Sequence, residues 1–381
     1  MLFQRDDSVW EKVHVDTTGR TREPCPLAGF SDGRLFLSVN PTLVTDPNAY
    51  GGPARPEILE FDTANLETPF KVILPQWDGK PPFTEHSYRS FAADSSRQEL
   101  ILFQNIGYTH TEWSFRDNKG QWISKGKLKW PWGAEYDKPQ PIRVCYPNVA
   151  LKDRVAHFCG VSDIMEPYLN WREFKQKLTG RQWDYDFRRL FYTWSRDITA
   201  GQFEDWVEIA SRDKTCGWIT PGDLWLAPDG AVHIVWAERA IDERLREEFF
   251  PDAVQSHAMN YAIVRDSKVV TRRSLMLAKE GKSREIPACP RFHVTPENHL
   301  FVLYYVYGAN VAGKSVSENR IMELHLDGSS NPTVQVPLKY PMNNFFTATV
   351  RGGSAPSKII DMFGTRVSGG GISYARIRLY E

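Results

Sequence analysis

A repeated hairpin constrains the fold of this 381-residue chain more than any other feature. The segment CPLAGFSDGRLFLSV (25–39) contains an apolar strand, a polar turn and a second apolar strand. The pattern returns about every 60 residues, which indicates a repeat architecture. Asp-Gly pairs at 32–33 and 229–230 are strong signals for hairpin turns. The later copies are HSYRSFAADSSRQELILFQ (86–104), CYPNVALKDRVAHFCGV (145–161), TPGDLWLAPDGAVHIVWAE (220–238), CPRFHVTPENHLFVLYYVY (289–307) and FTATVRGGSAPSKIIDMFG (346–364).

A second, more polar hairpin follows each apolar one, for example THTEWSFRDNKGQWISKGKL (109–128). Four antiparallel strands per repeat predict an all-β fold, a β-propeller of four-stranded blades. We count six blades, and the irregular region 165–187 leaves room for a seventh. The last repeat is one strand short, so we expect SVWEKVHVD (8–16) to close the last blade. The prediction is one domain over 1–381, with a two-domain division as the less favoured alternative.

Two insertions lengthen the third and fourth repeats. EPYLNWREFKQKLTG (166–180) predicts a helix with Pro167 in its first turn and Gly180 as its stop. ERAIDERLREEFF (238–250) predicts a second helix with one apolar stripe. Both follow the second strand of their blade, so both should rise from the same face of the ring. First and third strands begin on that face, and we expect the chemistry there.

The composition excludes several classes of partner. Lys+Arg and Asp+Glu are both 47, so no net charge attracts nucleic acid or an anionic membrane. No apolar run approaches the roughly 20 residues that span a bilayer. The N-terminus lacks the apolar core of a signal peptide, which predicts a cytoplasmic protein, or a secreted or periplasmic one if a leader was removed. The 13 Trp, 15 Tyr and 21 Phe suit strands and could also stack on sugars.

The same face collects several side chains capable of chemistry. Each one alone is better explained as a structural residue, and their convergence on one mouth is what suggests a site. His157 and His233 occupy matching positions inside second strands, so we interpret both as structural. A zinc site built from Cys25, Cys145, Cys216, Cys289 and His293 is a weak alternative because no tight ligand pair is present. The mouth candidates are Glu85, His86, Arg89, His110, Tyr146, Asp163, Arg188, Arg189, Tyr192, Asp223, Glu238, Arg239, His257, Arg291 and Asn310.

Three segments resemble one family of propellers. EHSYRSFAADSSRQELILFQNIGYTH, CYPNVALKDRVAHFCG and RRLFYTWSRD are similar to bacterial neuraminidase repeat (BNR) propellers, in particular the BNR-4-like polysaccharide lyases that include ulvan lyases and rhamnose–glucuronate lyases. SFRDNKGQW (114–122) and SRDITAGQFEDW (195–206) look like degenerate Asp-boxes. The resemblance covers most of the chain as a blade pattern, with sharp motifs only in 83–210. The resembling lyases are mostly seven-bladed, which differs from our count.

The resemblance implies a site and a reaction. Its two histidines and its "YP" tyrosine match His86, His110 and Tyr146. The family's neutralising arginine has no counterpart in HFCGVSD, and we expect Arg189 to neutralise the substrate carboxylate, with Arg188 or Arg239 as alternatives. Tyr146 and His86 would form the base and acid pair in either order, and His110 would position the uronate. The further residues expected to bind substrate are Arg188, Arg239, His257, Tyr192 and Arg89.

The predicted function is β-elimination on a uronate-containing poly- or oligosaccharide, with a carbohydrate as partner. No catalytic metal and no cofactor is expected, although a structural calcium or zinc ion stays open. One rival is a sialidase-like or other propeller glycoside hydrolase, but its early arginine segment has only a faint echo in TREPCP. The other rival is a non-catalytic propeller that binds glycans or proteins, since a fold does not fix a function.

Overall fold

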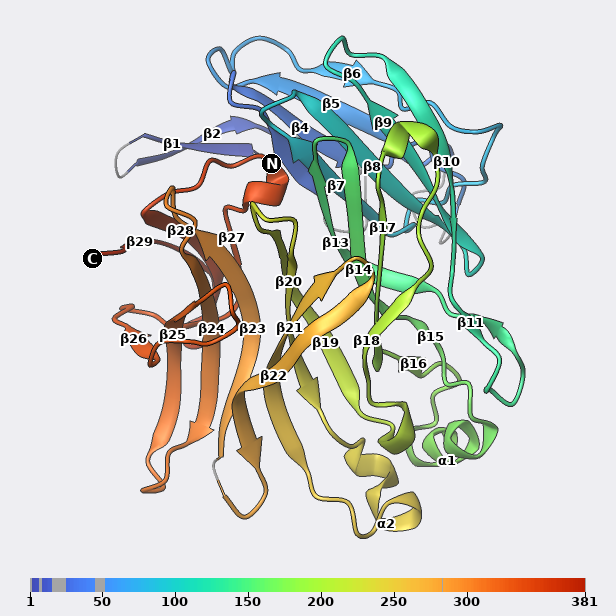
Figure 1. Ribbon diagram of the computed structural model, residues 1–381, viewed down its shortest axis with the longest axis vertical. Helices are drawn as coiled ribbons and strands as arrows, with labels where there is room; N and C mark the ends of the chain where they lie inside the picture. The colour runs from blue at the N-terminus through green and yellow to red at the C-terminus, as the bar shows by residue number, and fades with distance from the viewer. Residues whose placement is uncertain (1, 7–8, 16–24, 45–51, 283, 381) are drawn as a thin grey trace.

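Six antiparallel sheets follow one another around a ring (Figure 1). The structure, a computed structural model, describes residues 2–6, 9–15, 25–44, 52–282 and 284–380. Five sheets have four strands each, and the sixth has three described strands. The predicted six-bladed propeller is confirmed, and the region 165–187 contributes a helix and short strands in place of a seventh blade.

The blades are numbered in chain order. Blade 1 contains β3 (Leu27–Gly29), β4 (Arg34–Val39), β5 (Glu57–Asp62) and β6 (Lys71–Ile73). Blade 2 contains β7 (Arg89–Asp94), β8 (Glu99–Ile106), β9 (His110–Arg116) and β10 (Trp122–Lys129). Blade 3 contains β13 (Val144–Lys152), β14 (Val155–Ser162), β17 (Arg189–Ser195) and β18 (Val207–Ser211).

Blade 4 contains β19 (Trp218–Leu226), β20 (Val232–Arg239), β21 (Ser256–Arg265) and β22 (Lys268–Lys279). Blade 5 contains β23 (Arg284–Val294), β24 (Leu300–Ala309), β25 (Ser315–Leu324) and β26 (Val334–Val336). Blade 6 contains β27 (Met342–Thr347), β28 (Ile359–Arg366) and β29 (Ile372–Arg378).

Short elements precede the first blade or lie between strands. Three two-stranded pairs are formed by β1 (Leu2–Asp6) with β2 (Val9–His14), β11 (Trp132–Gly133) with β12 (Gln140–Pro141), and β15 (Ile164–Met165) with β16 (Tyr185–Asp186). The helices are α1 (Leu169–Thr179), α2 (Arg246–Phe249), η1 (Ile198–Ala200), η2 (Asp213–Thr215), η3 (Glu243–Leu245) and η4 (Val350–Gly352).

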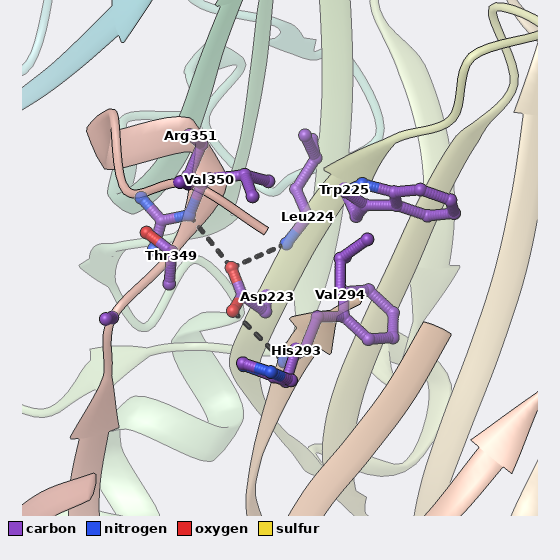
Figure 2. Close-up of a pocket in the computed structure, with 11 residues that line it drawn as sticks. Asp223, Leu224, Trp225, His293, Val294, Thr349, Val350 and Arg351 are labelled. Carbon is purple, nitrogen blue, oxygen red and sulfur yellow. Dashed lines mark hydrogen bonds and ion pairs between the residues drawn. The ribbon is translucent and has the colours of Figure 1, made fainter. Parts of the chain in front are cut away.

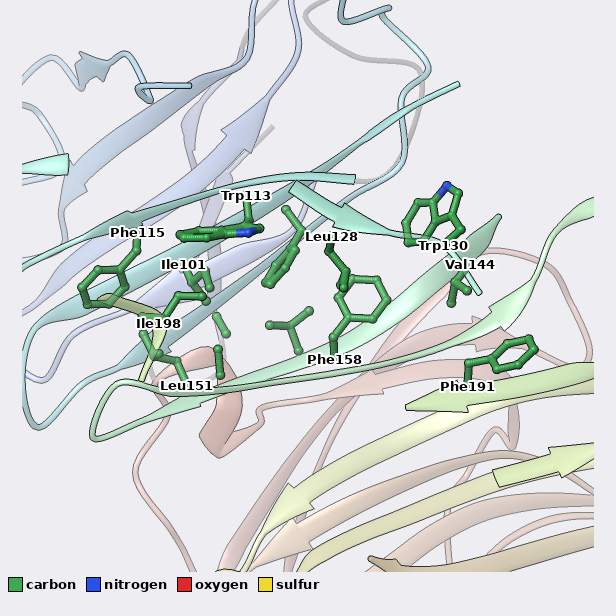
Figure 3. Close-up of a cluster of buried hydrophobic side chains, with 14 of the residues drawn as sticks. Ile101, Trp113, Phe115, Leu128, Trp130, Val144, Leu151, Phe158, Phe191 and Ile198 are labelled. Carbon is green, nitrogen blue, oxygen red and sulfur yellow. The ribbon is translucent and has the colours of Figure 1, made fainter. Parts of the chain in front are cut away.

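Apolar side chains fill the spaces between adjacent blades. Figure 3 shows the layer between blades 2 and 3, where Trp113 and Phe115 of β9 face Phe158 of β14. All three side chains are buried. Alternation along each strand sends one set of side chains to each neighbouring blade. Many of the aromatic side chains of the sequence therefore lie in these buried layers, and only the exposed rings are available to contact a ligand.

The N-terminal segment corrects the predicted closure of the ring. The prediction paired residues 8–16 with the last blade, and Ser8 and Asp16 lie outside the described residues. In the described part, β2 pairs with β1 as a hairpin, and β29 pairs with β28 alone. The hairpin does lie against blade 6, because the rings of Trp10 and Tyr374 are 5.2 Å apart. Side chains, rather than a backbone ladder, make this contact.

The two insertions contact each other beside the ring (Figure 1). Helix α1 ends at Gly180, whose φ of 66° accommodates the stop. The predicted helix over 238–250 is shorter than expected, because β20 continues to Arg239 and only η3 and α2 are helical. Trp171 packs on Phe250 with ring centroids 5.4 Å apart. Together the insertions form one wall on the face where second strands end.

The axis of the ring is filled by η4. This short helix, between β27 and β28, contacts β3, β7 and β13. Figure 2 shows its Arg351, whose Nε donates to Asp223 Oδ1 of blade 4 at 2.9 Å. The cavity beside this ion pair has a volume of about 20 Å³, close to that of one water molecule, which is too small for a sugar ring. No helix among the described residues has the length and apolarity to cross a membrane.

Candidate functional site

Three long connections between second and third strands rise from one face of the ring, which we call the mouth. They follow β4, β14 and β20, and the latter two carry α1 and α2. First and third strands begin at the same face. The side chains at these strand ends come from separate blades but share one surface.

Tyr146 lies at the mouth on a bulge in β13. The ladder between β13 and β14 shifts register between Cys145 and Asn148, and Tyr146 has a φ of +49°. A bulge re-aims the side chain that it carries. Cys289 of blade 5 has a φ of +50° at the corresponding shift in β23, so the bulge belongs to the repeat. In blade 3 this bulge presents a phenol that is 48% exposed.

The hydroxyl of Tyr146 is hydrogen-bonded to a second tyrosine, Tyr88. The two oxygens are 2.8 Å apart and the ring centroids 4.8 Å apart. Burial, the hydrogen bond to Tyr146 and the charge of Asp163 raise the pKa of Tyr88 far above its usual range. Tyr88 therefore stays protonated and can donate a hydrogen bond to the Tyr146 oxygen. Tyr88 was not among the site residues predicted from the sequence.

Arg143 lies at the centre of a group of tyrosines. Its Nη2 is 2.9 Å from Asp163 Oδ1, and its Cζ lies 4.0 Å from the ring centroid of Tyr108. The rings of Tyr88 and Tyr185 lie within 6 Å of the same carbon. The hydroxyl oxygens of Tyr108 and Tyr185 are 2.7 Å apart. Arg143 was not predicted from the sequence, because the arginines proposed to neutralise the carboxylate all follow Tyr146, whereas Arg143 precedes it by three residues.

Aromatic rings continue from Tyr146 across the mouth to blade 4. Phe187 lies 5.8 Å from Tyr146 and 4.6 Å from Trp218, measured between ring centroids. Tyr108, Tyr146 and Trp218 are all more than a third exposed. We call Tyr88, Tyr146, Phe187 and Trp218 the aromatic band. Exposed rings in a row are suited to stacking on the apolar faces of sugars.

His86 lies in the turn that leads into β7, two residues before Tyr88. Its Nδ1 is 3.8 Å from Glu85 Oε2, and about a third of its side chain is exposed. Glu85 itself is buried. The structure therefore brings His86 to the same blade edge as the two tyrosines.

His110 and Arg89 are both in contact with other protein groups. Both ring nitrogens of His110 are engaged, Nε2 with Glu112 Oε1 at 2.9 Å and Nδ1 with Thr109 Oγ1 at 2.7 Å. Arg89 is buried on β7, where its Nη2 lies 3.7 Å from Cys25 Sγ. These contacts are those of side chains that support the blade.

Arg188 and Arg189 are both held by carboxylates. Arg188 is 1% exposed, with Nη1 and Nη2 2.8 Å and 2.9 Å from the two Glu166 oxygens. Arg189 pairs with Glu135 and Glu208. The charge of each arginine is therefore compensated inside the protein, and a contact of either one with substrate stays a prediction.

Tyr192 is buried and hydrogen-bonded to His157 Nδ1 at 2.8 Å, so it does not reach the mouth. His233 pairs with Tyr261 in the same way at 2.5 Å. Burial lowers the pKa of His157 and of His233 to about 4. Both histidines are structural, as predicted.

Arg239 and His257, the last two of the residues expected to bind substrate, lie at the mouth. They are cross-strand neighbours at the ends of β20 and β21, and Arg239 is in turn opposite Trp218. Both side chains are partly exposed.

The described residues contain no group of three or more His, Cys, Asp or Glu side chains arranged to hold a metal ion. All five cysteines are free thiols.

Two solved structures show what the fold resembles. The polysaccharide lyase Uly1 matches with a TM-score of 0.50 and 12% identity over 96% of this chain and 82% of that chain. An α-L-arabinanase of Penicillium chrysogenum, solved with arabinobiose, matches with a TM-score of 0.50 and 10% identity over 93% of this chain and 92% of that one. At these identities the likeness shows the propeller fold alone.

No family model matches the chain, and no curated protein matches it either. The resemblance to BNR repeats therefore stays a prediction.

Proposed function

We propose that this protein is an enzyme that cleaves a uronate-containing poly- or oligosaccharide by β-elimination. The observation that carries the proposal is the placement of Tyr146 on a bulge at the mouth. Its hydroxyl is hydrogen-bonded to Tyr88, and Arg143 packs on the ring of Tyr88. Strained, exposed residues held by their neighbours are typical of functional sites. The shared fold with the lyase Uly1 is consistent with this reaction class.

β-Elimination requires three groups around one uronate. A cation must offset the carboxylate so that the C5 proton becomes acidic. A base removes that proton, and its electron pair forms the C4–C5 double bond while the C4–O4 bond breaks. An acid then protonates O4 of the leaving sugar.

The mouth contains a candidate for each role. Tyr146 is the base, and Tyr88 stabilises its ionised form by donating a hydrogen bond. His86 is the acid, and its Nδ1 lies 3.8 Å from Glu85 Oε2. Arg143 is the candidate to face the carboxylate in place of Arg189, because it packs on the ring of Tyr88 beside Tyr146, although it also pairs with Asp163. With this arginine the proposed reaction needs no metal ion or other cofactor. Arginine suits this task because its planar fork matches a carboxylate.

The aromatic band binds the sugars on either side of the cleaved bond. Rings from blades 2, 3 and 4 provide consecutive stacking positions along the mouth. The wall formed by α1 and α2 borders the end of the band near Trp218. We infer that it favours short chains or chain ends over the middle of a long polymer.

The direct test is incubation with a panel of uronate-containing polysaccharides and oligosaccharides. A rise in ultraviolet absorbance from the unsaturated uronate is the expected result. New reducing ends without that absorbance would identify a hydrolase, and binding without cleavage would identify a non-catalytic propeller. Either outcome would overturn the proposal.

A further inference from the structure

Arg239 differs from the other arginines of the mouth in having no hydrogen-bond or ion-pair partner among the described side chains. Its Nε is shielded from solvent without a hydrogen bond, and within the described ranges no carboxylate pairs with its guanidinium. Arg188, Arg189 and Arg212 all pair with carboxylates nearby. A shielded donor that lacks a partner is costly to the folded protein unless a ligand satisfies it.

The surroundings of Arg239 provide neutral hydrogen-bond donors and flat rings. Trp218, Arg239 and His257 are directly opposite one another across β19, β20 and β21, so their side chains share one face of blade 4. Tyr307 of blade 5 borders the same place and is stacked on Tyr305 with centroids 5.8 Å apart. Burial raises the pKa of Tyr307, and the positive charge of Arg239 opposes that rise, which reflects their proximity.

His257 adds a donor without adding a competing negative charge. Burial and the charge of Arg239 lower the pKa of His257 against the opposing charge of Glu243, which favours the neutral ring. Neither ring nitrogen is hydrogen-bonded to another described residue. The pair thus offers a full positive charge and an N–H side by side.

The aromatic band connects this place to Tyr146. Trp218 belongs both to the band, through Phe187, and to the row that contains Arg239. A glycan stacked along the band would therefore bring a neighbouring sugar to Arg239.

We propose that Arg239, His257 and Tyr307 form a second anion subsite, which binds a carboxylate or sulfate group on a sugar other than the one cleaved. The role as a glycan subsite rests on the proposed function, whereas anion binding itself does not. The substrate class thereby narrows to glycans with a charged group on at least two sugars.

The test follows the imidazole resonances of His257 by NMR, assigned with H257Q, during titration with sodium sulfate and, separately, sodium acetate at constant ionic strength. We expect a saturable shift with at least one anion, and the tighter anion identifies the group. In R239Q the apparent Kd should rise about tenfold or more, the scale of one charge-assisted hydrogen bond, while R239K should be weakened less.

R196Q is the matched control, because Arg196 pairs with the exposed Glu204 at the far end of β17. It should titrate like the unmodified protein. Resonances of His257 that do not move, or that move equally in R239Q, would overturn the subsite. Because no turnover is needed, this failure is distinct from a failure of the lyase assay.

The glycan itself is then tested by affinity. Uronate tetrasaccharides with and without sulfate, and their carboxyl-reduced forms, are titrated into the Y146F variant. R239Q in that background should weaken only the ligands that carry the second charge. Equal weakening of all ligands would contradict the assignment to a second sugar.

Discussion

The hydroxyl oxygens of Tyr88 and Tyr146, from two adjacent blades, lie 2.8 Å apart at the mouth of the ring. Burial and the hydrogen bond to Tyr146 raise the pKa of Tyr88, so Tyr88 keeps its proton, while Tyr146 is the more exposed partner. A pair of tyrosines with unequal surroundings can thus supply a base without a carboxylate.

The first prediction concerns the two proton-transfer groups. His86→Ala and Tyr146→Phe should each lower kcat by about 10²–10⁴-fold, because each removes a group that moves a proton in the transition state. Binding of substrate should change little. Steady-state kinetics with the substrate found in the panel, together with calorimetric binding, measures both. Tyr380→Phe, at the exposed end of the chain, is the matched control. Normal turnover by both variants would move the site elsewhere.

The second prediction isolates the role of Tyr88. Tyr88→Phe removes the donor that stabilises an ionised Tyr146, so the rise of kcat with pH should shift to higher pH. The full rate should return where Tyr146 ionises on its own. A pH–rate profile measures the shift. A uniform loss at every pH, with no shift, would indicate a merely structural tyrosine.

The third prediction separates two arginines. Arg143→Gln should lower kcat/KM far more than Arg189→Gln, because Arg143 packs on Tyr88, the hydrogen-bond partner of Tyr146, whereas Arg189 packs on Tyr136. Both arginines pair with carboxylates, so that pairing does not distinguish them. The expected difference is about tenfold or more, comparable to the loss of a charged hydrogen-bond partner. Melting temperatures of both variants show whether stability contributes. The reverse order would restore Arg189 as the neutralising residue.

The fourth prediction concerns pH and stability. Burial raises the pKa of Asp186 to about 7, above its ordinary value of 3.8. Between these two values the folded state holds a proton that the unfolded chain has lost, so stability should fall as pH rises through this window. Above it, this group adds no further slope. Asp186→Asn should remove that fall, which denaturant titrations between about pH 4 and pH 8 would measure.

Glu166 provides the internal comparison for this window. Its hydrogen bonds and ion pairs with Arg188 and Lys175 outweigh burial and lower its pKa to about 2. Its contribution to stability is therefore complete above the ordinary glutamate range and lost only in stronger acid. If the wild-type and Asp186→Asn stability curves were parallel from pH 4 to 8, the fourth prediction would be wrong.

The fifth prediction concerns a buried histidine. His233→Ala should cost about 2–4 kcal/mol of unfolding free energy, because it leaves a cavity and deprives the Tyr261 hydroxyl of its partner. Turnover per folded molecule should stay near normal. Chemical denaturation and activity corrected for the folded fraction measure the two effects. A selective loss of kcat at full stability would contradict the structural role.

The sequence predicted the ring because its repeat records the hairpins directly. Asp-Gly turns need a left-handed residue, and Gly33 and Gly230 have φ values of +91° and +81°. It also predicted that His157 and His233 are structural, since both occupy the same repeat position.

The sequence could not predict which charges are free. The sequence does not distinguish Arg188, Arg189 and Arg239. Contacts between distant segments, such as those of Arg188 with Glu166 and Asp213, show which of these charges are compensated. Tyr88 and Tyr185 were missed because their hydroxyl partners come from other blades or loops. The predicted pairing of the N-terminal strand with the last blade was wrong. The sequence shows that the last repeat is one strand short, but it does not show that β2 pairs with β1 instead of with β29.

The helix η4 and the ion pair between Arg351 and Asp223 close the centre of the ring. A glycan chain could not pass through the centre of such a ring. The proposed glycan substrate would have to lie across the mouth, and both fragments would leave by the face at which the intact chain arrived. Products and new substrate would then compete for the aromatic band, so the turnover rate would depend on the rate of product release.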